Sequence, residues 1–353
     1  MSGREHDVAV VGLGVMGSAA AYELAKRGLR VLGLERFHAG HDRGSSHGRT
    51  RVIRQAYFEH PDYVPLILRA YERWRALEME TGRELLRRTG ALMIGPPESV
   101  IVSGSLSSAR SHGLPHRWLT ANEVQSEFPM LTPEPGEVAL YEPAAGVLFA
   151  EEAVLAFQER ARELGADLRF GEFVAPHERP ARKTVVTTGP WMTDWMSDLP
   201  LTVERQVTYW LEPIELPLFI WDRGGRPFYG VPNVRGEGVK VAFHHGGETS
   251  TPDLVRREVQ AEEMAEMRAR LSKTVPGLNS LRRASTCLYT NTPDGHFAIG
   301  LSSNEVAVAS ACSGHGFKFA PVVGEILADL VVEGRSRIPI DLFRLDRFQG
   351  GEG

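Results

Sequence analysis

Three glycines near the N-terminus, Gly12, Gly14 and Gly17, constrain the fold of this chain more than any other feature. They follow a valine-rich run at residues 7–11, which is typical of a buried parallel strand, and they precede apolar residues at helical spacing. In a G-x-G-x-x-G turn between a strand and a helix, the backbone can approach a pyrophosphate that lies at the helix N-terminus. The sequence therefore predicts a dinucleotide-binding site.

A second short apolar run, residues 31–34, ends at Glu35. The helix between the two runs is expected over residues 16–27, with Gly28 ending it. The carboxylate of Glu35 would then accept hydrogen bonds from ribose hydroxyls. Because strand, turn, helix, strand and acid occur together, a nucleotide site is a better interpretation than a purely structural turn. The motif alone does not distinguish FAD from NAD.

The rest of the chain is organised around this unit. At 353 residues it exceeds the size of a single simple core. Nucleotide-type elements occur at both ends of the chain, with β-rich sequence between them, which predicts interleaved domains of the α/β class. Helices are expected over residues 63–81, 151–165, 254–271 and 320–332, and strands over residues 184–188, 203–211, 239–243 and 306–311.

The expected domains are discontinuous in sequence. The first is a Rossmann-type, cofactor-binding domain around a mixed, centrally parallel sheet, formed by residues 1–86, 147–200 and 288–353. The second is an α+β substrate domain on an antiparallel sheet, formed by residues 87–146 and 201–287. The segments of each domain would therefore meet only in the folded chain.

Composition argues against several classes of function. The net charge of −5 and the pI near 6.2 leave no electrostatic basis for nucleic acid binding. No apolar run reaches the roughly 18–20 residues of a membrane span, so no membrane partner is expected. Cys287 and Cys312 are too few for a disulfide framework, which favours a reducing compartment, and we expect the cytoplasm. The sequence indicates no metal site.

Five further blocks of sequence resemble one flavoenzyme family. They lie at residues 44–54 (GSSHGRTRVIR), 229–232 (YGVP), 240–244 (KVAFH), 287–297 (CLYTNTPDGHF) and 313–319 (SGHGFKF). Their order and identity resemble the monomeric sarcosine oxidase and N-methyltryptophan oxidase family, FAD-dependent amine oxidoreductases of the D-amino acid oxidase superfamily. The resemblance implies a monomer that binds FAD and oxidises a small secondary amine. An N-methyl amino acid such as sarcosine would give an imine, then an aldehyde and an amine, while dioxygen becomes hydrogen peroxide.

Two blocks imply residues that act on the flavin itself. In this family a cysteine thioether joins the flavin 8α-methyl group, and Cys287 occupies that position. Without the resemblance, a lone cysteine is more often a small buried hydrophobe. Lys240 stands in an alternating strand pattern, where a lysine is ordinarily a solvated surface charge. The resemblance implies instead that Lys240 lies over the flavin and stabilises developing superoxide.

The resemblance also implies a substrate side of the ring. Arg54 and Lys318 match the pair that binds the substrate carboxylate, to which an Arg fork and a Lys point charge are suited. Tyr229 and His244 match residues that line the substrate side and act in catalysis. Without the resemblance, these residues would be interpreted as surface cations, a strand aromatic and a structural histidine.

The remaining cofactor contacts are implied along the flavin. His47 and Arg51 match catalytic residues beside the ring, and a glycine loop around His315 precedes the helix expected from residue 320. A helix N-terminus directed at the pyrimidine would stabilise negative charge on the reduced ring. For His315, a direct contact and a loop position without a chemical role are equally consistent. The implied cofactor-binding residues are Gly12, Gly14, Gly17, Glu35, Ser45, Arg51, Gly189, Cys287, Gly314, Gly316 and Lys318.

The chain departs from the family pattern in several places. Residues 173–184 are shorter than the family's small β-meander, and we expect this loss to lie away from the active site. Phe228 replaces an aromatic hydroxyl, which is expected to change the polarity of the pocket. Arg49 replaces an acidic residue and is expected to face solvent.

Alternatives remain open on the residues alone. A cyclic imino acid or a biosynthetic amine intermediate would use the same flavin chemistry. An NAD(P)-dependent reductase would account for the glycine turn, but not for the blocks around Cys287, Lys240 and Lys318. A non-catalytic flavin-binding protein would have no need of the candidate catalytic positions, which are all present.

Overall fold

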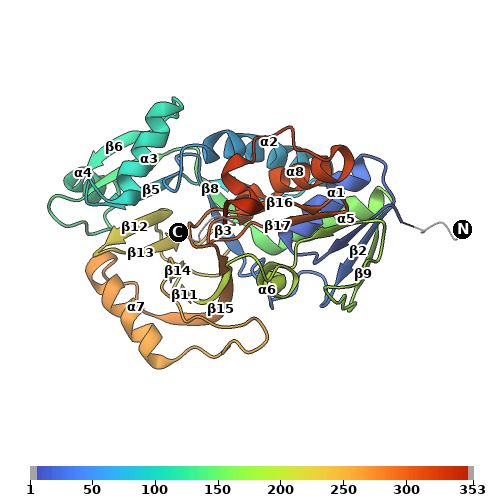
Figure 1. The fold of residues 1–353 in the computed structure, drawn as a ribbon. Helices are drawn as coiled ribbons and strands as arrows, with labels where there is room; N and C mark the ends of the chain where they lie inside the picture. The colour runs from blue at the N-terminus through green and yellow to red at the C-terminus, as the bar shows by residue number, and fades with distance from the viewer. Residues whose placement is uncertain (1–5, 349–353) are drawn as a thin grey trace, which may run out of the picture.

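The computed structural model describes residues 6–348, which contain two large sheets and one small sheet (Figure 1). Neighbouring strands of the first large sheet are parallel, except for one antiparallel pair at the edge. Its strands are, in spatial order, β16 (Ala298–Ser303), β17 (Val306–Ser310), β10 (Lys183–Val186), β1 (Val8–Val11), β2 (Val31–Glu35) and β9 (Asp167–Phe170). The predicted sheet, mixed with a parallel centre, is confirmed.

Helices from distant parts of the chain cover one face of this sheet (Figure 1). They are α1 (Val15–Lys26), α5 (Ala150–Glu163) and α8 (Ala320–Glu333), with α2 (Tyr63–Thr81) packed against α8. Gly324 lets α1 and α8 approach closely, because a Cβ there would come within 2.8 Å of the backbone of Ala19. Every residue of β1, β2 and β17 is buried, which explains why these strands are continuous apolar runs in the sequence.

The second large sheet is antiparallel, apart from the pairing between two strands at its middle, β12 (Phe219–Arg223) and β5 (Ala91–Gly95). Its strands are, in spatial order, β15 (Leu281–Asn291), β11 (Thr202–Leu211), β14 (Lys240–Phe243), β13 (Arg226–Val231), β12, β5, β7 (Val138–Glu142) and β6 (Arg117–Thr120). The helices of this part are α3 (Val100–Ser111), α4 (Ala121–Glu127) and α7 (Ala261–Thr274) (Figure 1). The predicted α/β class with a second, antiparallel sheet is confirmed.

A small third sheet carries part of the candidate site. It consists of β3 (Thr50–Ile53), β8 (Gly146–Phe149) and β4 (Leu86–Arg88). The short helix α6 (Met192–Trp195) follows β10. The predicted domain boundary after residue 287 lies within β15, which pairs with β11 along its whole length. The division of the chain into domains therefore remains a prediction.

One predicted helix begins later than expected. The sequence predicts a helix over residues 254–271, but α7 begins at Ala261, after a capping box between Gln260 and Glu263. The reason is tertiary, because buried Arg205 donates hydrogen bonds to the backbone oxygens of Arg256 and Glu258. Those carbonyl groups are thereby held in an irregular segment.

Among residues 6–348, no helix combines the length and the hydrophobicity that crossing a membrane requires. Within the same residues, no group of three or more His, Cys, Asp or Glu side chains is arranged to hold a metal ion.

Candidate active site

A large pocket is lined by residues from both large sheets and from β3. Gly17 is the one predicted site residue outside it, and it packs against the turn instead. Two of the predicted residues in its lining, Gly12 and Lys318, are 306 positions apart in the chain. The predicted site residues that line it are Gly12, Gly14, Glu35, Ser45, His47, Arg51, Arg54, Gly189, Tyr229, Lys240, His244, Cys287, Gly314, Gly316 and Lys318.

The glycine turn has the geometry that the motif predicts. Gly12 has a φ of +87°, and a Cβ there would come within 2.7 Å of the Thr187 carbonyl oxygen. At Gly17, a Cβ would lie 1.8 Å from the carbonyl oxygen of Gly12, so only glycine lets α1 pack against the turn. Gly14 is the N-cap residue of α1, and the helix N-terminus therefore opens into the pocket.

Glu35 has a structural role that the sequence did not predict. Its carboxylate accepts hydrogen bonds from the backbone N–H groups of Leu13 (2.8 Å) and Phe37 (3.0 Å). Burial acts to raise the pKa of Glu35, but His41 and these two donors lower it below its usual value. The ionised carboxylate thus ties the end of β2 to the glycine turn, while it also lines the pocket where a ribose would lie.

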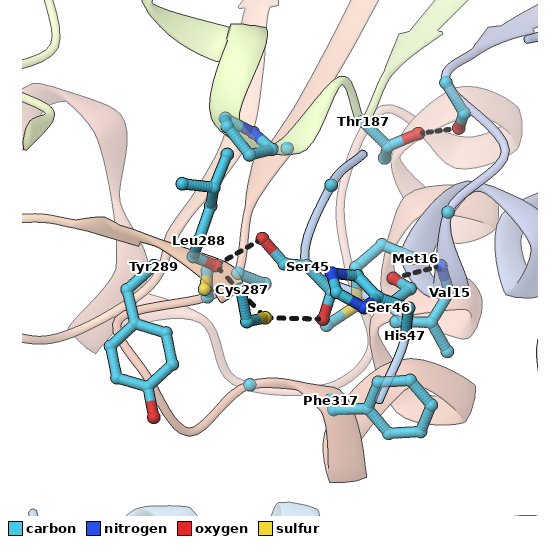
Figure 2. Close-up of a pocket in the computed structure, with 18 of the residues that line it drawn as sticks. Val15, Met16, Ser45, Ser46, His47, Thr187, Cys287, Leu288, Tyr289 and Phe317 are labelled. Atoms are coloured by element: carbon cyan, nitrogen blue, oxygen red, sulfur yellow. Dashed lines mark hydrogen bonds between the residues drawn. The ribbon is translucent and has the colours of Figure 1, made fainter. Parts of the chain in front are cut away.

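Cys287 lies in a positively charged environment. Its sulfur is 3.6 Å from Nη2 of Arg51, and Figure 2 shows it beside the backbone oxygens of Ser45 and Leu288. Burial raises the pKa of the thiol, but the charges of His47 and Arg51 outweigh this effect and lower the pKa to about 6. Cys287 is therefore a thiolate at neutral pH, which is the nucleophilic form. Cys312 also lines the pocket, but burial raises its pKa.

Lys240 is buried, which rules out the surface interpretation of its strand pattern. Its side chain points inward from β14, with 3% of the residue exposed, and Nζ donates hydrogen bonds to the carbonyl oxygens of Thr50 (2.5 Å) and Gly48 (3.1 Å). Burial, followed by the charge of Arg51, holds the pKa of Lys240 well below its usual value. Any positive charge on Lys240 is therefore in a poorly solvated position next to the pocket.

The rings of His244, Tyr229 and Tyr289 gather on another part of the lining. Burial, followed by the charge of His245, holds the pKa of His244 well below its usual value, so this imidazole is neutral. The hydroxyl of Tyr289 lies 3.5 Å from Nδ1 of His244. A Cβ at Gly314 would come within 2.7 Å of Tyr289, which explains the glycine in this loop. Tyr289 was not singled out from the sequence, although it stands two residues after Cys287.

Arg54 and Lys318 both line the pocket, but Arg54 is already paired. Arg54 is 2% exposed, and its Nη2 donates hydrogen bonds to both carboxylate oxygens of Glu59 at 2.6–2.7 Å. Burial opposes ionisation of Glu59, but Arg54 and then other nearby cations lower its pKa to about 2. Burial, followed by the charge of Arg54, lowers the pKa of Lys318 to about 7. Glu59 was missed from the sequence, where its only signal is an acid five residues after Arg54.

His315 does not face the pocket with a free ring nitrogen. Its Nδ1 lies 2.6 Å from the hydroxyl of Tyr57, and its Nε2 lies 3.0 Å from the carbonyl oxygen of Gly295. Gly316 packs so tightly that a Cβ would lie 1.7 Å from the Ala311 carbonyl oxygen. After this loop and a short 3-10 helix, α8 begins at Ala320, as predicted.

Two expectations about departures from the family are wrong. Phe173, Val174 and Pro176 line the pocket, so the shortened segment borders the site instead of lying away from it. The reason is that the chain after β9 returns beside the end of β2, where the backbone N–H of Glu172 donates to the carbonyl oxygen of Glu35. Phe228 is fully buried and absent from the lining, because successive residues of β13 face opposite sides of the sheet.

The third departure, Arg49, faces solvent in part. Its side chain is 54% exposed and pairs with Glu237 at 3.2 Å. Its backbone has a φ of +67°, and its N–H donates to the carboxylate of Glu151. This conformation carries the chain from the loop into β3, and thus positions Arg51.

The lining fits an FAD molecule. The glycine turn and Glu35 suit the pyrophosphate and the ribose, and the thiolate of Cys287 lies farther along the same pocket. Three buried hydroxyls of the lining, on Thr50, Thr188 and Ser310, have no hydrogen-bond partner among residues 6–348. Buried polar groups are normally paired, so these hydroxyls are suited to a polar ligand.

Comparison with known proteins agrees with this chemistry. Residues 7–330 match the FAD dependent oxidoreductase family. Monomeric sarcosine oxidase of Streptomyces avermitilis is 44% identical, with 96% of each chain covered. N-methyl-L-tryptophan oxidase of Yersinia pestis is 32% identical, with 98% of this chain and 100% of the relative covered. Among solved structures, L-proline dehydrogenase from P. horikoshii has a TM-score of 0.85 and 25% identity, with 99% of both chains covered.

These findings select FAD over the nicotinamide cofactor that the glycine turn left open. The relatives are similar over nearly their whole length, so the similarity includes both large sheets and not only the nucleotide-binding unit. The chain therefore belongs to the FAD dependent oxidoreductase family and is an FAD-dependent amine oxidase of the group that includes monomeric sarcosine oxidase and N-methyltryptophan oxidase.

Proposed function

We propose that this chain oxidises a small secondary amine that carries a carboxylate, most simply an N-methyl amino acid such as sarcosine. The observation that carries the proposal is that two buried cations, Arg54 and Lys318, line the same pocket as the thiolate of Cys287. Buried cations are costly unless an anion pairs with them. Glu59 already pairs with Arg54, and a substrate carboxylate would supply an anion for Lys318. The relatives named for sarcosine and N-methyltryptophan oxidation support the same substrate class.

The substrate carboxylate has to share or replace an existing partner. Glu59 holds Nη2 of Arg54, so a carboxylate that binds this nitrogen has to share it with Glu59 or displace Glu59. Lys318 offers a second positive charge, and its Nζ already donates to the carbonyl oxygen of His315 at 2.6 Å. In this proposal Lys318 attracts the carboxylate as a point charge, while Arg54 orients it.

The residues around the pocket favour the uncharged form of the amine. Arg51 and the buried Lys240 both line the pocket, and a positive charge near the substrate nitrogen disfavours an ammonium group. His244, which is neutral, and Tyr229 and Tyr289 add no negative charge that would stabilise an ammonium. The amine would therefore lose its proton on binding and present the nitrogen lone pair that oxidation requires.

Bound FAD supplies an acceptor for a hydride equivalent from the carbon next to the nitrogen. The amine becomes an imine, and water hydrolyses the imine to an aldehyde and an amine. We propose dioxygen as the final acceptor, reduced by two electrons and two protons to hydrogen peroxide. In its protonated form Lys240 would stabilise the anionic charge that develops on oxygen, because its ammonium group is held in a poorly solvated place.

We further propose that FAD is attached covalently through the sulfur of Cys287, and that the chain acts as a monomer. The lowered pKa of Cys287 supports the attachment, since the thiolate is the form that bonds to carbon. Forming the thioether would replace one C–H bond of the 8α-methyl group and release a proton and two electrons, which dioxygen would accept. The test is an absorption spectrum of purified protein and of the pellet after acid precipitation. Flavin that stays in the pellet, but leaves it in Cys287→Ser, is the expected result. Flavin released from the unmodified protein would contradict the thioether and leave the oxidase intact.

A second candidate substrate class is a cyclic imino acid. The observation that favours it is the similarity to L-proline dehydrogenase over 99% of both chains. Peroxide formation with sarcosine, N-methyltryptophan, proline and pipecolate separates the two candidates. The main proposal expects the highest kcat/KM with an N-methyl amino acid. Turnover of proline or pipecolate alone would select the cyclic class, and absence of turnover with every amine would favour a non-catalytic flavoprotein.

A further inference from the structure

Tyr57 contacts both cations of the proposed carboxylate site, although the sequence did not mark it as a site residue. The guanidinium carbon of Arg54 lies 4.2 Å from the centre of the Tyr57 ring, as in a cation–π contact. Nζ of Lys318 lies 3.4 Å from the hydroxyl of the same tyrosine. Tyr57 itself is fully buried. One side chain therefore lies against both charges.

The segment that carries Tyr57 is firmly held. The buried carboxylate of Glu142 accepts hydrogen bonds from the backbone N–H groups of Gln55 (2.6 Å) and Ala56 (2.9 Å). The hydroxyl of Ser108, on α3, donates to the carbonyl oxygen of Tyr57 at 2.5 Å. Because backbone and side chain are both packed, the tyrosine hydroxyl has little freedom to move.

A chain of hydrogen bonds from Gly295 through His315 sets the direction in which the hydroxyl of Tyr57 donates. The carbonyl oxygen of Gly295 can only accept, so Nε2 of His315, 3.0 Å away, carries the ring hydrogen. Burial, ahead of the nearby charges, lowers the pKa of His315 to about 4, so Nδ1 is an unprotonated acceptor at neutral pH. The hydroxyl of Tyr57, 2.6 Å from Nδ1, therefore donates its hydrogen to His315.

Only lone pairs of the Tyr57 oxygen then remain to face Lys318. We propose that Tyr57 is a positioning residue of the carboxylate site: its ring supports Arg54, and its oxygen, oriented by His315 and Gly295, accepts a hydrogen bond from Lys318. Because the hydroxyl hydrogen of Tyr57 is donated to His315, the tyrosine oxygen can only accept a hydrogen bond from Lys318. This favours the ammonium form of Lys318, which is the form that attracts a carboxylate. This inference rests on the proposed function, and it extends that function to residues that do not bind the substrate.

Some groups near Lys318 lower its pKa and others raise it. Burial lowers the pKa of Lys318 most, and the charges of Arg54 and Arg51 lower it further, whereas Glu59 raises it. His315 is neutral, and its carbonyl oxygen accepts a second hydrogen bond from Lys318. With a pKa of about 7, Lys318 would lose its proton as the pH rises through neutrality. The hydrogen bond to Tyr57 would therefore matter most at and above neutral pH.

The test is the pH dependence of carboxylate binding to the holoenzyme. The probe is (methylthio)acetate, which resembles sarcosine but has no amine to oxidise, and its binding is followed by the change in the flavin spectrum from pH 5 to 9. In Tyr57→Phe, we expect the loss of affinity with rising pH to begin at lower pH, with Kd about tenfold higher at pH 8, as loss of a hydrogen bond to a charged group predicts. The difference should shrink towards pH 5, where Lys318 is protonated in both proteins.

Tyr63→Phe is the matched control. Its ring lies 4.8 Å from the ring of Tyr57, and its hydroxyl lies 3.2 Å from Nδ1 of His296 and makes no contact with Lys318 among residues 6–348. The Kd of this variant for (methylthio)acetate should equal that of the unmodified enzyme at every pH. A second variant, His315→Ala, keeps the tyrosine hydroxyl but removes the acceptor that orients it, and should shift the profile in the same direction by less.

The outcomes separate this inference from the proposed function. Superimposable binding profiles for Tyr57→Phe, Tyr63→Phe and the unmodified enzyme would overturn the role of Tyr57. A uniform loss of affinity at all pH values would also overturn it, because that is the effect of a general packing defect. If the unmodified enzyme binds the probe in the expected pH-dependent way but oxidises no amine, the proposed function fails and the inference about Tyr57 stands.

Discussion

The guanidinium of Arg51 lies 3.6 Å from the sulfur of Cys287, on the strand that crosses from the glycine-rich loop into the pocket. Hydrogen bonds to the carbonyl oxygens of Ser45 and Thr50, each 2.8 Å long, hold Arg51 in this position. The arrangement gives Cys287 a reactivity that its burial alone would suppress. It connects a residue of β3 with one of β15, 236 positions later in the chain.

The first prediction concerns the reactivity of Cys287. In flavin-free protein, its alkylation by iodoacetamide should have a midpoint near its pKa of about 6, because the charges of His47 and Arg51 outweigh the effect of burial. The variants His47→Asn and Arg51→Gln should move the midpoint to higher pH. Mass spectrometry of the labelled peptides measures each site, with Cys312, whose pKa burial raises, as the internal control. A common midpoint for both cysteines would contradict this prediction.

The second prediction concerns Glu35 and FAD affinity. Glu35→Ala removes the acceptor for the N–H groups of Leu13 and Phe37, which positions the glycine turn. In a Cys287→Ser background, we expect FAD to bind about 10- to 100-fold more weakly, as loss of hydrogen bonds to a charged group predicts. Fluorescence titration of flavin-free protein measures the change. Asp167→Asn, an exposed carboxylate at the sheet edge, should leave the Kd unchanged.

The third prediction separates the two half-reactions at Lys240. Lys240→Met keeps most of the length of the side chain but removes its amino group, so reoxidation by dioxygen should slow by about 100- to 1000-fold, as for other fixed groups that stabilise developing charge. Anaerobic reduction by the amine should change far less. Stopped-flow absorbance follows each half-reaction by itself. Equal slowing of both would show that Lys240 acts in general folding or flavin placement and not on oxygen.

The fourth prediction concerns the ion pair between Arg54 and Glu59. In Glu59→Gln the buried Arg54 loses its charged partner, so the free energy of unfolding at pH 7 should fall by about 3 kcal/mol, as for other broken buried pairs. The pKa of Glu59 is lowered to about 2 in the folded chain, so its contribution is complete above its unfolded value near 4.5 and is lost as the pH falls towards 2. The two proteins should therefore converge in stability over this acid range.

Urea denaturation at several pH values measures this effect. Glu237→Gln, which removes the exposed partner of Arg49, is the control and should cost less than about 1 kcal/mol. A constant difference between Glu59→Gln and the unmodified protein from pH 7 to 3 would show that the pair does not titrate in this way.

The nucleotide-binding unit could be predicted because its requirements are local. Gly12 needs a positive φ and a close neighbour, Gly17 has to leave room for the turn, and both conditions follow from their spacing after one strand. The boundaries of α2 could likewise be predicted, because its buried residues recur at helical spacing over 19 residues. The start of α7 could not, because distant Arg205 binds the carbonyl groups that a longer helix would use.

The alternation of side chains between the two faces of a strand explains β13, but it did not predict the position of Lys240 in β14. Tyr229 lines the pocket and its neighbour Phe228 packs against Trp221 in the core, as the period of two in a strand dictates. The expectation that Phe228 changes the polarity of the pocket overlooked this period. For Lys240, the same pattern favoured solvent, but Gly48, in the loop before β3, and Thr50, the first residue of β3, supply carbonyl acceptors for its side chain.

The sequence by itself determined the βαβ unit, the α/β class and the residue types needed for an FAD-dependent oxidase, because each depends on short-range spacing or on blocks of matching residues. Only the tertiary structure decided the charge states and the pairing within the site. Glu59 binds Nη2 of Arg54, and Tyr57 contacts His315, 258 residues away. Burial and electrostatics at such contacts depend on distances through space, which the order of residues along the chain does not contain.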